Sequence, residues 1–263
     1  MTFLTQRQFD LIFYACLAGL ALGAIAVEAQ DQRTSARREP VLVELFTSEG
    51  CSDCPPADKL LGVLDEKQPT AGVQAIVLSE HVTYWNHDGW TDPFSLVELT
   101  ERQQEYANRF GLSSTYTPQM VVDGLTQFVG SDAHALEVAM NNASSQPKED
   151  LTIANATWEN GSARFAVHTS AGQNTKLIAV LAANETHERV LAGENAGRTL
   201  EHVAVVRVMK SFGIEAADGR TVQLPGGPLA HKEEAQGPVR LVVFLVDQKT
   251  GHVVGAAEQT LTR

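Results

Sequence analysis

The chain has 263 residues, of which 43% are hydrophobic and 20% are charged. This length leaves room for two domains of ordinary size, and the composition is that of a globular protein. With 32 acidic and 20 basic residues, the formal net charge is −12. Because non-specific binding to nucleic acid or to an anionic membrane surface needs basic patches, this balance argues against both kinds of partner.

The first 29 residues have the pattern of a targeting segment. Arg7 precedes a run of apolar and small residues at 11–27, and small residues at Ala26 and Ala29 offer cleavage sites. We therefore predict a signal peptide at 1–29 and a periplasmic or secreted protein. An uncleaved N-terminal anchor is the alternative, because the run is near the short limit for a membrane span, and only then do we expect membrane contact. Residues 30–40 are polar and predict a linker.

Two cysteines, Cys51 and Cys54, stand between an apolar run at 41–46 and an amphipathic segment at 59–67. This pattern predicts a strand, a tight turn and a helix. The free N–H groups and the dipole at a helix N-terminus stabilise a thiolate, which is the reactive form of cysteine. The spacing also allows the two sulfurs to form a disulfide. We predict a dithiol–disulfide site in which Cys51 is the exposed nucleophile and Cys54 is the resolving thiol.

Two other interpretations of the cysteine pair stay open, a purely structural disulfide and a metal site completed by histidine. The remaining cysteine, Cys16, lies in the N-terminal apolar run, so the sequence offers no second pair for a zinc site. A disulfide that closes a four-residue loop restrains the unfolded chain little, which favours chemistry over bracing. Thiol–disulfide exchange needs neither metal nor cofactor, and we expect none.

The first half alternates strands and helices. Predicted strands at 41–46 and 73–78 flank the first helix, which implies parallel pairing through a crossover. A loop rich in aromatic and charged residues follows, then a helix at 95–111, a hairpin whose turn is Asp123-Gly124, and a last helix at 132–145. This order predicts a thioredoxin-like α/β domain at residues 41–147.

Four further residues are candidates for this site. Pro118 immediately precedes an apolar strand, and we expect a cis Thr117–Pro118 bond that shapes a substrate groove beside the cysteines. Glu44 interrupts the first apolar strand, and His81 follows the second. Both are candidates for proton handling, since burial shifts the pKa of such groups. The alternative for Glu44 is a structural carboxylate with a polar partner.

From residue 148 onward the hydrophobic period changes to two. Apolar alternation on both sides of Asn160-Gly161 predicts a hairpin, and further strands are expected at 177–183, 203–210, 240–247 and 252–262. We predict an all-β, antiparallel, sandwich-like domain at 148–263 without helices. Within it Arg198, His202 and Arg207 are candidates for a second site that binds an anion or a partner. A solvated strand edge with structural polar bonds is the alternative.

Several motifs together resemble one bacterial family. They are F-T-S-E-G-C-S-D-C-P-P-A-D at 46–58, W-x(4)-W-T-D-P-F at 85–94, Y-T-P-Q-M-V-V-D-G at 116–124 and G-E-N-A-G-R-T-L-E-H at 193–202. The family is known as domain of unknown function 1223, and the resemblance spans essentially the whole mature chain. It implies a secreted protein with a thioredoxin-like N-terminal half and a β-rich C-terminal half, and it brings no established substrate.

The sequence thus favours an exported thiol–disulfide oxidoreductase-like protein that uses Cys51 and Cys54 on protein or small-thiol partners. One alternative is a periplasmic copper- or zinc-binding or metal-delivery protein, in which His81 completes the ligand set of the two cysteines. Another is a non-catalytic envelope-binding module. The sequence leaves the partner, the direction of electron transfer and the oligomeric state open.

Overall fold

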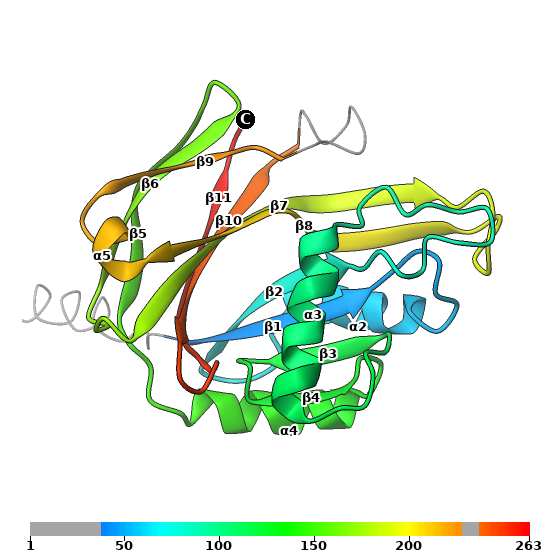
Figure 1. Cartoon of the computed structure of the whole chain (residues 1–263), viewed down its shortest axis with the longest axis horizontal. Helices are drawn as coiled ribbons and strands as arrows, with labels where there is room; N and C mark the ends of the chain where they lie inside the picture. Colours follow the sequence, from blue (N-terminus) through cyan, green and yellow to red (C-terminus); the bar gives the residue numbers. More distant parts are fainter. Residues whose placement is uncertain (1–37, 228–236) are drawn as a thin grey trace, which may run out of the picture. The chain divides into compact units, whose positions relative to one another are not determined.

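The computed structural model describes residues 38–227 and 237–263 (Figure 1). Contacts group Glu39–Arg263 into one compact unit. The predicted signal peptide, Cys16 and residues 30–37 of the predicted linker lie outside the described residues. Within the described ranges, every helix is too short or too polar to cross a membrane.

The described chain forms two sheets and four helices. The first sheet contains β1 (Glu39–Thr47), β2 (Val73–His81), β3 (Gln119–Val122), β4 (Thr126–Val129), β7 (Thr175–Arg189), β8 (Thr199–Gly213), β10 (Val239–Asp247) and β11 (Val253–Leu261). The second contains β5 (Leu151–Glu159), β6 (Ser162–Thr169) and β9 (Thr221–Pro225). The helices are α2 (Pro55–Lys67), α3 (Val97–Phe110), α4 (Ala133–Ser144) and α5 (Ile214–Ala217). The strand orders are β11-β10-β7-β8-β2-β1-β3-β4 and β5-β6-β9.

Most local elements lie where the sequence predicts them, because their ends are set by turn and cap residues. Helix α3 ends at Gly111, whose φ of 68° suits a left-handed C-cap. Asp123 and Gly124 have φ values of 49° and 63° and join β3 to β4. Asn160 and Gly161, at 50° and 74°, join β5 to β6 in the same way. Both predicted hairpins are confirmed.

The predicted assembly of these elements is wrong. We expected a thioredoxin-like α/β domain and a separate all-β sandwich, but the described residues form a mostly-β fold with few helices around an eight-stranded mixed sheet. Strands from both sides of residue 147 share that sheet, because β2 pairs in parallel with β8 at Ser79 and Val205. Only β5, β6 and β9 stand apart in a second sheet, and the short helix α5 lies in the half predicted to lack helices. The pairing of β2 with a strand so distant in the sequence could not be predicted, because no local sequence pattern specifies it.

Strands β7 and β10 carry two cores, one on each face. Ile178 and Val180 of β7 face the core shared with the first-half strands, whereas Leu177 and Ala179 face the core against the second sheet. Strand β10 alternates in the same way. Successive side chains of a strand point to opposite faces, so a strand buried on both sides is apolar throughout. These strands therefore join the two halves into one hydrophobic unit.

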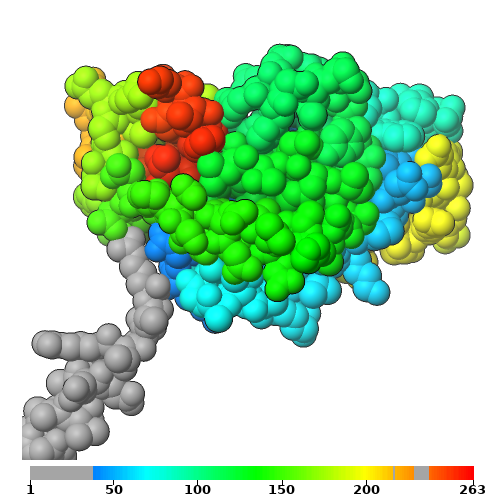
Figure 2. All heavy atoms as spheres, turned by 90° about the horizontal axis from the view of Figure 1, so that it is seen from below, coloured from blue at the N-terminus to red at the C-terminus, as the bar shows by residue number. Residues whose placement is uncertain are grey.

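The helices cover both faces of the first sheet. Leu45 of β1 and Ala57 of α2 both come within 3.1 Å of the position that a Cβ on Gly130 would take, so they share one face. The next residue back on β1, Glu44, contacts Arg102 of α3 on the other face. Helices α2 and α4 lie side by side on a face seen in Figure 2, and line a groove of about 380 Å³. The disulfide described below does not line it.

Asp123 ties the turn between β3 and β4 to later parts of the chain. Its carboxylate accepts a hydrogen bond from the Leu42 backbone at 2.8 Å and pairs with Lys148. Its carbonyl accepts another from the Val253 backbone at 2.8 Å. Burial raises the pKa of Asp123 from 3.8 to about 6, although Lys148 opposes the shift.

Asp123 is expected to make stability depend on pH between 4 and 7. Its pKa is higher in the folded than in the unfolded chain, so the stabilisation from protonation is full below pH 4 and is lost as pH rises through 6. The unfolding free energy of the wild type minus that of Asp123→Asn should fall by about 2–3 kcal/mol over this range. Urea denaturation at each pH measures it. The backbone N–H of Thr250 lowers the pKa of Asp247, so the difference for Asp247→Asn should be nearly constant between pH 4 and 7 and should fall only as the pH drops below 4. A flat difference for Asp123→Asn would contradict the expectation.

Candidate functional site

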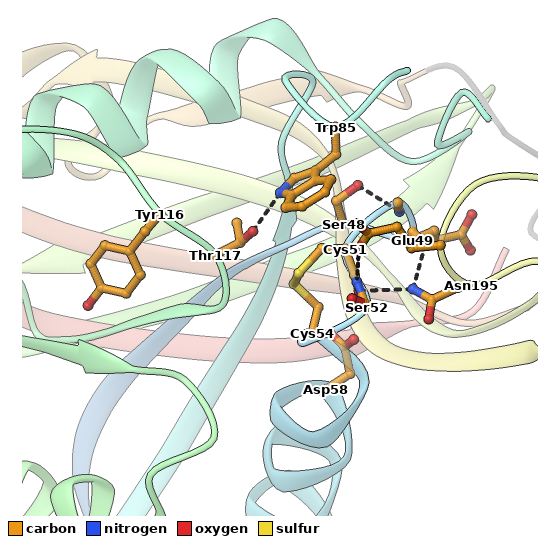
Figure 3. Close-up of a disulfide and its surroundings, with 12 residues drawn as sticks. Ser48, Glu49, Cys51, Ser52, Cys54, Asp58, Trp85, Tyr116, Thr117 and Asn195 are labelled. Carbon is orange, nitrogen blue, oxygen red and sulfur yellow. Dashed lines mark hydrogen bonds between the residues drawn. A yellow bond between two sulfur atoms is a disulfide. The ribbon is translucent and has the colours of Figure 1, made fainter. Parts of the chain in front are cut away.

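Cys51 and Cys54 form a disulfide between β1 and α2, with their Cα atoms 5.4 Å apart (Figure 3). Cys54 is the N-cap residue of α2, and Pro55 and Pro56 occupy its first positions, where a missing N–H leaves no hydrogen bond unmade. The predicted strand–turn–helix setting is confirmed. A disulfide between these residues indicates an oxidising compartment.

Both cysteines are buried, with exposed fractions of 1% for Cys51 and 0% for Cys54. The prediction that Cys51 is exposed is therefore wrong. The connection between β7 and β8, residues 190–198, which we name the 190–198 loop, is hydrogen-bonded to the turn that carries the cysteines. The Asn195 amide donates hydrogen bonds to the carbonyls of Glu49, at 2.8 Å, and Cys51, at 2.9 Å. The Ser52 backbone N–H donates to the Glu194 carboxylate at 3.0 Å.

The 190–198 loop holds Asn195 in place through its own bonds. The Arg198 guanidinium donates to the Asn195 side-chain oxygen at 2.9 Å, so the amide nitrogen points at the two carbonyls. The backbone of the loop closes on itself, since Val190 donates to the Arg198 carbonyl and Gly197 donates to the Val190 carbonyl. Arg198, predicted as part of a second site, thus orients the residue that bonds to the disulfide turn.

Two tryptophans of the segment after β2 line the other side of the site. The Trp85 indole donates to the Thr117 hydroxyl at 2.6 Å, and Figure 3 shows its ring beside Cys51. The Trp90 indole donates to the Glu49 carboxylate at 3.1 Å. A Cβ on Gly50 would lie 2.7 Å from the Trp85 carbonyl oxygen, so only glycine fits at this contact.

Pro118 lies near the first turn of α2. The Thr117–Pro118 bond is cis, as the sequence predicts. A Cβ on Gly130 would lie 3.1 Å from both Pro118 and Ala57, which places the proline ring near the start of the helix. The role of Thr117 and Pro118 in a substrate groove stays a prediction.

Five ionisable side chains, none more than 6% exposed, lie together beside the disulfide, and we name them the buried acid–base cluster: Glu49, Asp58, His81, Asp92 and His202. Ring nitrogens of His202 lie 3.5 Å from a Glu49 oxygen and 3.6 Å from an Asp58 oxygen. His81 contacts Asp92 at 2.8 Å, and its ring centre is 4.7 Å from that of His202. The cluster therefore joins β1, α2, β2 and β8.

The cluster shifts the pKa values of its members. Burial alone lowers the pKa of His202, but the carboxylates of Asp58 and Glu49 outweigh it and raise that pKa to about 10. Burial raises the pKa of Glu49. Burial also opposes ionisation of Asp92, yet His81 and backbone N–H groups lower the pKa of Asp92 to about 2. At neutral pH His202 is therefore a buried cation held between carboxylates.

The structure brings some predicted residues to the site and not others. His81 and His202 belong to the buried acid–base cluster. Glu44 lies on the other face of β1, where the Arg102 guanidinium and the Tyr106 hydroxyl hydrogen-bond to it, both at 2.6 Å. Arg207 lies at a bulge of β8 and donates to the Phe94 carbonyl at 3.1 Å, so it supports the segment that carries the tryptophans.

Sequence reasoning missed Glu49, Asp58, Asp92 and Asn195 as site residues. Each lies inside one of the motifs that carried the family resemblance, so the motifs held the signal. Asp92 fastens the segment after β2 to the end of β1, because it accepts the backbone N–H of Glu49 and of Phe94, both at 2.9 Å. Among residues 38–227 and 237–263, no set of three or more His, Cys, Asp and Glu side chains is arranged to hold a metal ion.

The fold and the site together define a mostly-β protein with a buried disulfide at the start of a helix. A family model described as a protein of unknown function, DUF1223, matches residues 42–245, and the chain belongs to this family. The crystal structure of protein AGR_C_4864 from Agrobacterium tumefaciens is similar in fold, with a TM-score of 0.61 and 24% identity. The match covers 83% of this chain and 92% of that one. A search of curated proteins found no match.

Proposed function

We propose that this chain is an exported protein whose Cys51–Cys54 disulfide exchanges with the thiols of a protein or small-thiol partner. One observation carries the proposal: the disulfide stands at the N-terminus of α2 beside the buried acid–base cluster. The helix N-terminus stabilises a thiolate, and ionisable groups next to a reactive pair are typical of sites that move protons. The predicted signal peptide supports export, and the disulfide fits an oxidising compartment.

A bracing role explains the disulfide less well. It closes a loop of four residues, which restrains the unfolded chain little. Hydrogen bonds from Asn195 and to Asp92 already fix the same turn in the folded chain. The cysteines therefore add little rigidity that the surrounding bonds do not supply.

Because Cys51 is buried, exchange requires the site to open, and the opening we propose is release of the 190–198 loop from the Cys51 turn. A partner thiolate then attacks the Cys51 sulfur, the Cys51–Cys54 bond breaks, and Cys54 leaves as a thiolate. A second partner thiolate attacks the partner sulfur of the mixed disulfide and releases Cys51. The partner loses two electrons and gains a disulfide, while the two cysteines gain two electrons and become thiols. The reverse sequence reduces a partner disulfide.

The variant Cys54→Ser tests the proposal. Without its resolving thiol, Cys51 is expected to accumulate a stable mixed disulfide with oxidised glutathione, at least tenfold faster than Cys54 in the matched variant Cys51→Ser. Intact-protein mass spectrometry measures both adducts. Equal rates in the two variants, or labelling that appears only in denaturant, would mean that the folded protein does not present Cys51.

Burial of both cysteines favours a second candidate, a non-catalytic binding module with a structural disulfide. In that case the double variant C51S/C54S keeps its function in the cell, and the wild-type disulfide resists reduction until the chain unfolds. The glutathione experiment distinguishes the two candidates, because only the first predicts exchange in the folded state.

A further inference from the structure

Asp58 lies one helical turn after Cys54 on α2, and its backbone N–H donates to the Cys54 carbonyl at 3.1 Å. Residues four apart share a helix face, so the two side chains are neighbours. Figure 3 shows the Asp58 carboxyl group next to the Cys54 end of the disulfide. Glu44, the carboxylate predicted to handle protons, lies on the other face of β1, whereas Asp58 lies next to Cys54.

Asp58 and His202 have unusual surroundings for buried groups. Within the described residues, neither carboxylate oxygen of Asp58 and neither ring nitrogen of His202 has a hydrogen-bond partner. The contact between them, at 3.6 Å, is an ion pair. A buried polar atom without a hydrogen bond costs about 1–3 kcal/mol, so such atoms in a folded protein need an explanation.

Disulfide chemistry supplies that explanation. Cys54 is 0% exposed in the disulfide, so a neighbouring ionisable side chain is better placed than bulk water to give a proton to the thiolate that forms when the disulfide opens. The Cys54 thiol also has to lose a proton before the disulfide can close. The ionisable groups around it are Asp58 on α2, His202 on β8, Glu49 after β1 and the His81–Asp92 pair. Asp53 and Glu194 are exposed to water.

We infer that Asp58 exchanges a proton with Cys54 and that His202, held between Asp58 and Glu49, is the positioning residue for that carboxylate. On closing, the Cys54 thiol gives its proton to Asp58, and the thiolate attacks the Cys51 sulfur of a mixed disulfide. The partner then leaves as a thiolate, which takes a proton from water. On opening, the Cys54 thiolate takes a proton from Asp58. This inference rests on the proposed function.

The test measures how fast the disulfide closes at different pH values. The mature chain carrying glutathione on Cys51 is prepared at pH 4, then shifted to pH 6–9, and the released glutathione is followed. The wild-type rate is expected to change little over this range. In Asp58→Asn the disulfide should close at least 100-fold more slowly at pH 7. Its closing rate should rise about tenfold per pH unit, because hydroxide then removes the proton from the Cys54 thiol. The exposed variant Asp53→Asn should keep the wild-type profile.

The outcomes separate the inference from the proposed function. If the wild-type protein neither opens nor closes its disulfide in the folded state, both fail. If it does, and Asp58→Asn keeps the wild-type pH profile, only the inference is overturned. If Asp58→Asn does not fold, the variant His202→Gln tests the inference instead. Loss of the His202 cation disfavours the charged form of Asp58, so the closing rate should change with pH within the range where the wild-type rate is constant. An unchanged profile in His202→Gln overturns the inference, whereas a structural role would change the melting temperature alone.

Discussion

Replacing Arg102 with methionine is expected to lower the free energy of unfolding by about 3–5 kcal/mol. The Arg102 guanidinium hydrogen-bonds to Glu44, which is fully buried on β1, and to the Tyr106 hydroxyl at 3.0 Å. It also lies over the rings of Tyr106 and Phe244. Without the guanidinium, the Glu44 carboxylate is left as a buried charge without its cation, and this is the source of the large loss.

A second buried carboxyl group, that of Glu80, lies near Arg102 but does not reverse the balance of charge around it. Burial raises the pKa of Glu80 well above its ordinary value, and the nearby Glu44 carboxylate raises it further. Both effects favour the neutral form of Glu80, and the Arg102 guanidinium hydrogen-bonds to Glu44. Arg102 and Glu44 form a buried ion pair, and removal of either side chain leaves the other without its partner.

Guanidinium chloride denaturation measures the Arg102→Met effect. The matched control is Arg164→Met, because Arg164 and Glu159 form an exposed pair at 3.8 Å that contributes at most about 1 kcal/mol. The double variant Glu44→Gln, Arg102→Met is expected to recover part of the loss, since it removes the uncompensated charge. An Arg102→Met protein as stable as the Arg164→Met control would show that the buried pair contributes nothing.

Replacing Asn195 with alanine is expected to speed reduction of the Cys51–Cys54 disulfide by roughly 10–100-fold. The change removes two hydrogen bonds that fasten the 190–198 loop to the cysteine turn, at the carbonyls of Glu49 and Cys51. Each such bond stabilises the closed loop by about 1 kcal/mol, and every 1.4 kcal/mol changes an equilibrium tenfold. The loop therefore opens more often and a reductant reaches the sulfurs sooner.

The rate is measured with dithiothreitol at pH 7 by titrating the thiols that appear. Asn142→Ala, an exposed change on α4, is the control and should leave the rate at the wild-type value. The denaturant dependence of the rate separates loop opening from unfolding of the whole chain, because only unfolding exposes a large surface. If Asn195→Ala is reduced no faster than the control, the loop does not limit access to the disulfide.

The cysteine site could be predicted only in part. The disulfide and the helix after it follow from short-range spacing, whereas the cis bond before Pro118 was expected from the predicted thioredoxin-like order of elements. The burial of Cys51 does not follow from spacing, because residues far away in the sequence, such as Asn195, are brought to this turn only in the folded chain. Glu44 and His81 were both predicted to handle protons. Because side chains alternate along β1, Glu44 lies on the face covered by α3, whereas His81 belongs to the buried acid–base cluster.

The sequence by itself determined the local elements, their turns and the family. Gly111 ends α3, and Asn160-Gly161 turns β5 into β6, because the backbone conformations there depend on the residues themselves. Only the tertiary structure decided that β8 pairs with β2, which joins both halves in one sheet and brings His202 to Asp58. Many strands present compatible edges and apolar faces, so the partner is chosen by the packing of the whole core.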